Sequence, residues 1–103
     1  MRPALAVIIT PQAAEDLSAA WARLRERNPR AADEWLAGIR QMILGLGSFP
    51  EAHPVAPESA AFDLQIRRAL YGRGTRWRIY YTVIDTKVQV LHVRHGRRSD
   101  WLP

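Results

Sequence analysis

The sequence predicts an α+β fold in which a two-helix hairpin packs on a mostly antiparallel four-stranded sheet, in the order β-α-α-β-β-β. Three observations predict it. Two successive segments carry apolar residues at helical spacing, and each opens with a capping residue followed by proline. The last third of the chain contains apolar runs that alternate with polar residues around a short turn. A length of 103 residues, 48% of them hydrophobic, suits one core and a single domain, residues 1–103.

The first strand and the first helix are predicted from residues 4–27. Residues 4–9 form a continuous apolar run, which is typical of a buried strand. Thr10 and Pro11 then provide a helix cap and a first helical position, so a helix is predicted over residues 11–27. Its apolar residues recur at helical spacing: Ala14, Leu17, Trp21 and Leu24.

A second helix is predicted to begin at once, with Asn28 as its cap and Pro29 at its first position. Its apolar stripe comprises Ala32, Trp35, Leu36, Ile39, Ile43 and Leu46. Gly47 is the expected stop. Two helices joined by almost no loop are expected to form an antiparallel hairpin.

The remaining elements are a loop and three strands. Residues 49–59 contain Pro50, Pro54 and Pro57 and are predicted to be a connecting loop. Residues 64–70 are a predicted strand that ends at a glycine-containing turn. Residues 77–84 and 87–94 are predicted to pair as a hairpin around Asp85 and Thr86.

A two-residue turn at Asp85 and Thr86 would fix which side chains share a face. Val83 would face Val88, Tyr81 would face Val90, and Ile79 would face His92, on the side that packs against the helices. The opposite, open side would carry Arg78, Tyr80, Thr82, Lys87, Gln89, Leu91, Val93 and His95. A change of one residue in the pairing would reverse this assignment.

These faces separate the two histidines near the end of the chain. His92 is expected to be a packing residue, whereas His95 is expected on the open side with Arg78 and Tyr80. The open face is predicted to gather cations and one aromatic ring: Arg67, Arg78, His95, Arg97, Arg98 and Tyr80. Such a surface suits either nucleic-acid phosphates, with the ring available for base stacking, or an acidic protein segment.

Composition limits the remaining possibilities. The whole net charge of +5 lies in residues 52–103, which favours an acidic or polyanionic partner for that half. No cysteine is present, so disulfides and thiolate metal sites are excluded. The longest apolar stretches are far shorter than a bilayer span. We expect a cytoplasmic protein with no membrane contact, no metal and no cofactor.

Residues 77–100, WRIYYTVIDTKVQVLHVRHGRRSD, contain an aromatic-Arg-apolar-x-Tyr strand, a turn, an apolar strand and a glycine followed by arginines. This order is similar to the pattern of the RelE/ParE family of toxins from bacterial type II toxin-antitoxin systems. ITPQAAEDL, NPRAADEWLAGI and the Phe-Pro pair after the second helix agree with it in order and spacing. The resemblance covers nearly the whole chain.

The resemblance implies the fold predicted above and a cognate antitoxin that wraps and neutralises the toxin. The family contains plasmid-stabilising, growth-inhibiting proteins of two activities. RelE-like members cleave messenger RNA on the ribosome, whereas ParE-like members inhibit DNA gyrase and are not nucleases.

The resemblance also suggests roles for individual residues. In a nuclease, Arg78 and Arg98, or Arg97 with a shift of one residue, would hold the phosphate. His95 could transfer a proton, which is our own inference because the family motif does not supply it. Arg67, Tyr80, Arg97 and Trp101 are the further phosphate-binding or target-binding candidates.

Other positions depart from the nuclease pattern. Gln65 and Arg67 stand where the nucleases carry lysines, and no tyrosine lies near the end of the chain. We therefore favour gyrase inhibition, with a ribosome-dependent, metal-independent endoribonuclease as the alternative. An inactive family member or a plain RNA-binding module is the third possibility.

Overall fold

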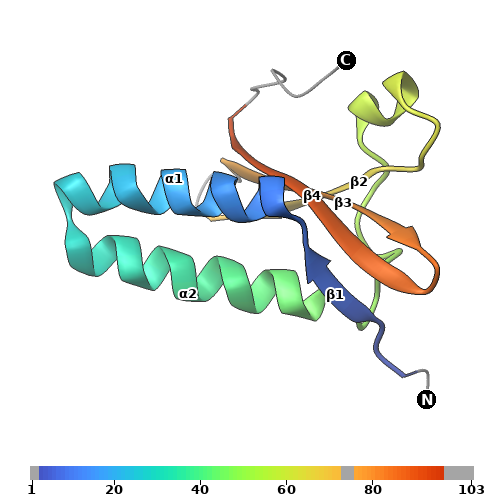
Figure 1. Ribbon diagram of the computed structural model, residues 1–103, viewed down its shortest axis with the longest axis horizontal. Coiled ribbons are helices and arrows are strands. Elements are labelled where there is room, and N and C mark those ends of the chain that lie inside the picture. The colour runs from blue at the N-terminus through green and yellow to red at the C-terminus, as the bar shows by residue number, and fades with distance from the viewer. Residues whose placement is uncertain (1–2, 73–75, 97–103) are drawn as a thin grey trace.

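The computed structural model describes residues 3–72 and 76–96. It shows two antiparallel helices against one side of a four-stranded sheet (Figure 1). The elements are β1 (Ala6–Ile9), α1 (Pro11–Arg27), α2 (Pro29–Gly45), the short 3₁₀ helix η1 (Pro57–Ala61), β2 (Arg67–Tyr71), β3 (Trp77–Ile84) and β4 (Lys87–His95). The strand order across the sheet is β1-β4-β3-β2; β1 is parallel to β4 and the other pairs are antiparallel. The predicted α+β fold and element order are therefore confirmed. None of the described helices is both long and apolar enough to cross a membrane.

The predicted caps start both helices. The Thr10 hydroxyl accepts a hydrogen bond from the backbone N–H of Ala13, and the Asn28 side chain does the same for Ala31. The backbone N–H of Asn28 also donates to the carbonyl of Leu24 at 3.0 Å, so one residue both ends α1 and begins α2. This shared cap explains why the hairpin needs almost no loop.

The second helix ends at Gly45 with Leu46 as its C-cap, so the predicted stop, Gly47, is the first residue beyond the cap. Gly47 also allows close approach of two backbone segments. A Cβ atom at this position would lie 2.2 Å from the carbonyl oxygen of Leu5. The backbone N–H of Leu5 donates to the carbonyl of Gly47 at 2.9 Å, which ties the segment before β1 to the end of α2.

The hairpin of β3 and β4 has the two-residue turn that was predicted. Asp85 and Thr86 both have positive φ angles, 51° and 61°, the conformation of a primed turn that matches the twist of the strands. Val83 pairs with Val88. Tyr81 pairs with Val90, as expected.

Beyond this point a β-bulge changes the register. Tyr80 pairs with His92 and Ile79 pairs with Val93, so Leu91 is the additional residue of β4. The predicted pairing of Ile79 with His92 is therefore wrong. The extra residue exchanges the faces of all later positions of β4, so Val93 enters the core and His92 leaves it.

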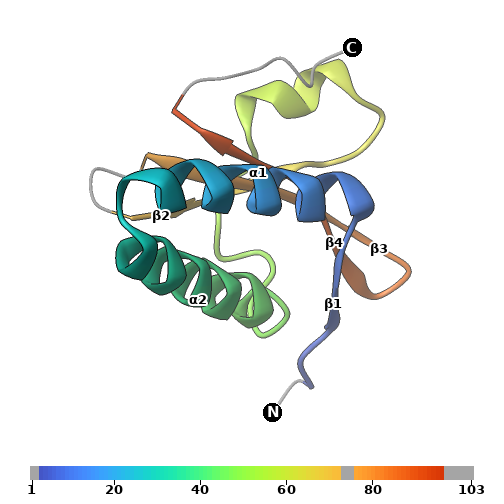
Figure 2. The same cartoon turned by 60° about the vertical axis from the view of Figure 1, so that its left-hand side comes forward.

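The sheet has apolar clusters on both faces. The main core lies between the sheet and the two helices and includes Ile39, Ile43, Tyr81 and Val90, each fully buried. A smaller cluster lies on the other face, where Ala56, Ile66 and Tyr80 pack with the partly buried Phe62 and Leu91. The segment containing η1 covers this second face, with the sheet between it and α2 (Figure 2). The segment containing η1 therefore partly covers the sheet face that was predicted to be open.

Candidate functional site

Cations from three strands share the sheet face opposite the helices. Arg78 of β3 is paired with Arg94 of β4, and Arg68 of β2 is paired with Tyr80, whose other neighbour is His92. We call these five residues the arginine face. Their side chains, apart from the fully buried Tyr80, are partly exposed. Because like charges on neighbouring strands repel, this face is suited to an anion.

Tyr80 lies on this face beneath the segment that contains η1, and it is fully buried. Its hydroxyl donates a 2.5 Å hydrogen bond to Oε2 of Glu58, which belongs to η1. Burial raises the pKa of Tyr80, and the hydrogen bond to Glu58 raises it further, while Arg78 acts in the opposite sense. We predicted an exposed Tyr80 ring that could stack on a base. This prediction is wrong, because the side chain is fully buried and its hydroxyl binds Glu58 of η1.

A buried carboxylate on α1 organises the edge of the arginine face. Asp16 is 8% exposed and accepts hydrogen bonds from the backbone N–H of Val93 at 2.9 Å and from Gln12 at 3.0 Å. It also lies 3.5 Å from Nη1 of Arg94 and 3.5 Å from Nδ1 of His92. Asp16 therefore replaces a strand partner for β4 beyond the end of β1 and fixes two side chains of the face.

Arg67 does not lie on the arginine face. It is paired with Tyr81 on the helix side of the sheet. Its guanidinium donates to the backbone carbonyl of His53 at 2.7 Å and, more weakly, to that of Glu51 at 3.4 Å. The predicted grouping of Arg67 with Arg78 is wrong. Side chains alternate between the two faces along β2, so Arg67 lies on the helix side and Arg68 lies on the opposite face with Arg78.

His95 also lies away from Arg78. It pairs with Trp77, and the two rings meet edge to face with centroids 4.8 Å apart. The ring centroid of Trp77 also lies 4.7 Å from that of Trp35 of α2, so this aromatic group belongs to the helix side. The predicted open-face position of His95 is wrong because of the bulge at Leu91. The remaining predicted site residues, Arg97, Arg98 and Trp101, lie outside the described residues.

Four residues of this region were not predicted from the sequence: Asp16, Glu58, Arg68 and Arg94. The alternation along β2 could have identified Arg68, had the start of the strand been known. Arg94 and His92 required knowledge of the bulge. Among residues 3–72 and 76–96, no three His, Cys, Asp or Glu side chains lie close enough to hold a metal ion.

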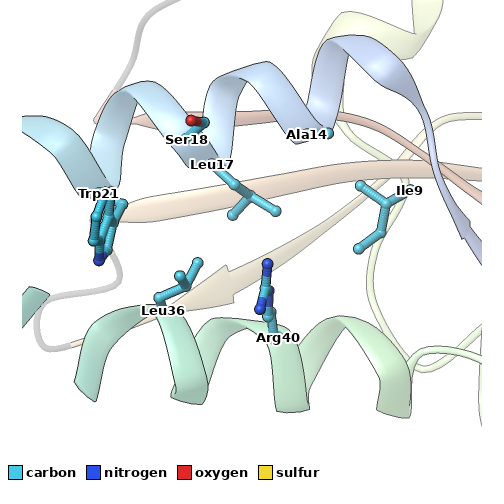
Figure 3. A pocket seen from close by; sticks show the side chains of 7 residues that line it. All are labelled: Ile9, Ala14, Leu17, Ser18, Trp21, Leu36 and Arg40. Carbon is cyan, nitrogen blue, oxygen red and sulfur yellow. The ribbon is translucent and has the colours of Figure 1, made fainter. Parts of the chain in front are cut away.

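A separate groove lies between the two helices, on the other side of the molecule. It has a volume of about 420 Å³, and its lining is mostly apolar: Ile9, Ala14, Leu17, Ser18, Trp21, Leu36 and Arg40. Figure 3 shows the Arg40 side chain rising from α2 toward α1, between Leu36 and Ile9. The indole N–H of Trp21 donates to Asp33 at 3.0 Å, which holds one end of the groove. The groove is suited to an apolar segment that carries a carboxylate.

Comparisons with known proteins agree with this architecture. Residues 7–100 match the family model described as the ParE toxin of the type II toxin-antitoxin system parDE. A chain from the solved structure of the chromosomal ParDE toxin-antitoxin system of P. aeruginosa has a similar fold, with a TM-score of 0.74 and 17% sequence identity. That match covers 90% of this chain and 97% of the other. No curated protein matches by sequence. Because the family model covers nearly all of the sequence, this chain belongs to the ParE toxin family of type II toxin-antitoxin systems.

Proposed function

We propose that this toxin inhibits DNA gyrase and that a cognate antitoxin blocks it by binding to its surface. The observation that carries the proposal is the match of residues 7–100 to the ParE toxin model. Gyrase inhibition requires a rigid surface but no proton-transfer chemistry. Two groups expected to support RNA cleavage are poorly placed for it, since Tyr80 is buried against Glu58 and His95 contacts Trp77 on the other face.

The groove between α1 and α2 supports the antitoxin part of the proposal. It offers a continuous apolar lining with the guanidinium of Arg40 inside it. An amphipathic helix with an acidic residue in its apolar stripe would complement both features. The described structure carries exposed apolar side chains elsewhere too, such as Phe49, which is 71% exposed, and Leu44, which is 64% exposed. A partner that wraps around the toxin would cover more than one of these surfaces.

The alternative function is ribosome-dependent cleavage of messenger RNA, and one observation favours it. The bulge brings His92 onto the arginine face beside Tyr80 and near Arg94. A histidine next to arginines is the combination that metal-free phosphodiester cleavage needs for proton transfer and for stabilising charge on the phosphate. In this alternative, His92 rather than His95 transfers the proton.

The test is induction of the toxin in cells, followed by mapping of transcript ends, together with a gyrase supercoiling assay on the purified protein. Gyrase inhibition predicts intact transcripts and blocked supercoiling, with no change for His92→Gln. Translation-dependent cuts with normal supercoiling, abolished by His92→Gln, would instead establish the nuclease and refute our proposal.

A charge-reduced variant extends the test to Arg78 of the arginine face and to Arg98, which lies outside the described residues. Arg78→Ala with Arg98→Ala should raise the concentration needed for half-inhibition about tenfold or more while the protein still folds, because arginine contacts often dominate protein interfaces. The matched control is Arg23→Ala with Arg30→Ala, which removes the same charge from the exposed surface of the helices. Equal inhibition by both double variants would show that Arg78 and Arg98 do not contact the target.

A further inference from the structure

A second pocket lies beside Tyr81 and shares no lining residue with the arginine face or with the groove between the helices. It has a volume of about 250 Å³, and its walls come from three separate parts of the chain: the segment around Pro50, the segment around Gln65 and strand β3. Pockets that bind drug-sized molecules usually have volumes of roughly 300–1,000 Å³. This pocket is therefore better suited to one long side chain of a partner protein.

Hydrogen bonds between distant segments hold the walls of this pocket in place. The Tyr81 hydroxyl donates to the backbone carbonyl of Pro50 at 2.6 Å. The Thr82 hydroxyl donates to the carbonyl of Gln65 at 2.8 Å. The guanidinium of Arg67 donates to a backbone carbonyl of the segment after α2 at 2.7 Å. Because these bonds join β3 and the start of β2 to the segment after α2, the pocket is preformed and a ligand needs to order little of the chain.

The charge of this pocket differs from that of the rest of the surface. Its charged lining residues are Glu51, Asp63 and Arg67, so two carboxylates stand against one guanidinium on a chain whose net charge is +5. Both carboxylate residues are exposed. Among residues 3–72 and 76–96, no cation comes within salt-bridge distance of Asp63. A basic group would be attracted here, whereas an acidic segment or a phosphate backbone would be repelled.

Apolar side chains beside these carboxylates are accessible to a partner. Leu64 is 41% exposed and Val83 is 43% exposed, and both line the pocket. Lysine and arginine carry a hydrophobic stem that packs along apolar surface while the charged head group stays near polar groups. A stem in contact with Leu64 and Val83 would leave the head group beside the carboxylates. The pocket thus provides both features that recognise a long basic side chain.

We propose that the pocket beside Tyr81 receives an arginine or lysine side chain from an apolar segment of the protein that the toxin inhibits. This inference rests on the proposed function in one respect, because gyrase is then the protein that supplies the segment. The antitoxin is a less suitable partner for this pocket, since the groove that contains Arg40 favours an acidic segment, which Glu51 and Asp63 would repel.

The first experiment is an NMR titration of the isotope-labelled full chain with a capped Leu-Arg-Leu tripeptide. One side chain and its neighbours make few contacts, so the expected Kd is on the order of 1 mM. The chemical-shift changes should concentrate at residues 50–51, 63–67 and 81–83. A capped Leu-Lys-Leu peptide should bind at the same residues, and a capped Leu-Glu-Leu peptide should not bind there.

Variants of the pocket test the contribution of charge and of apolar contact. Glu51→Gln with Asp63→Asn should weaken binding of Leu-Arg-Leu about fivefold, because both acceptors lose their charge. Leu64→Ser should weaken it about threefold. The matched control is Glu15→Gln with Glu26→Gln, which removes the same charge from the exposed surface of α1 and should leave the affinity within about twofold. Thermal unfolding verifies that each variant is folded, and Asp63→Lys, with an expected loss of about tenfold, replaces the double variant if that one is not.

The second experiment measures inhibition of supercoiling by the same variants. Glu51→Gln with Asp63→Asn should raise the concentration needed for half-inhibition about fivefold, while the control on α1 should not change it. Unchanged inhibition by the pocket variant would refute the inference and leave gyrase inhibition standing.

Three results of the titration would also overturn the inference. They are shift changes located elsewhere, equal binding of Leu-Glu-Leu, and equal weakening by the control on α1. A wild-type protein that does not inhibit gyrase would refute the proposed function instead. The titration would then still decide whether the pocket accepts a basic side chain.

Discussion

Removal of the Asp16 carboxylate should destabilise the fold and the edge of the arginine face together. In Asp16→Ala the backbone N–H of Val93 loses its acceptor, which costs about 1–3 kcal/mol for a buried donor. The nearby Arg94 also loses its acidic neighbour. We expect a loss of about 3 kcal/mol in the free energy of unfolding. For a domain of this size that is a decrease in Tm of roughly 12–24 °C.

Asp16→Asn distinguishes the two contributions. Its amide oxygen can still accept from Val93, but it carries no charge for Arg94. We expect this variant to lose about half as much stability, measured by urea unfolding with an unchanged m-value. Glu15→Ala, at the exposed neighbouring position, is the control and should change stability by less than about 0.5 kcal/mol. Two results would refute the argument that this carboxylate substitutes for a strand partner. One is an Asp16→Ala variant as stable as wild type, and the other is an equal loss in the free energy of unfolding for Asp16→Ala and Asp16→Asn.

Two further predictions concern the core. Gly47→Ala should lower the free energy of unfolding, measured by urea titration, by about 2 kcal/mol or more, because the new methyl group would lie 2.2 Å from the Leu5 carbonyl oxygen. The control is Gly45→Ala, which has open space around the new methyl group and should be neutral or stabilising in the same titration. Burial raises the pKa of Tyr81 from 10.0 to about 12, so its contribution to stability is complete below pH 10 and is lost as the pH rises toward 12. The Tyr81→Phe variant should therefore lose less stability than wild type as the pH is raised from 10 to 12. The same dependence of the free energy of unfolding on pH in both proteins would contradict this assignment.

Local sequence signals predicted the helical hairpin and the β-turn. Thr10-Pro11 and Asn28-Pro29 place caps whose hydrogen bonds involve only the next few residues, so no tertiary information is needed. The turn at Asp85 and Thr86 is similarly local. Tyr81, Val88 and Val90 were predicted from alternation alone to face the helices, and all three lie in the main core. Val83 was predicted on the same side but is 43% exposed.

The candidate site could not be predicted in the same way, because its geometry depends on contacts between distant segments. The bulge at Leu91 lies close to the point where Asp16 of α1 accepts the hydrogen bond from Val93, a contact that spans 77 residues of sequence. The residue Glu58 reaches the sheet from a proline-rich segment that had been expected to be a plain loop. One additional residue in one strand was sufficient to exchange the positions of His92 and His95.

The parallel pairing of β1 with β4 has a consequence for synthesis of the protein. The contact of Ala6 with Lys87, and those that follow it, join the first strand of the chain to the last. While the chain emerges from the ribosome, the helical hairpin can form from local contacts, but β1 must wait for β4. The sheet that carries Arg78 and Arg94 can therefore be completed only after β4 has been synthesised. A nascent chain that lacks β4 should not present the assembled arginine face.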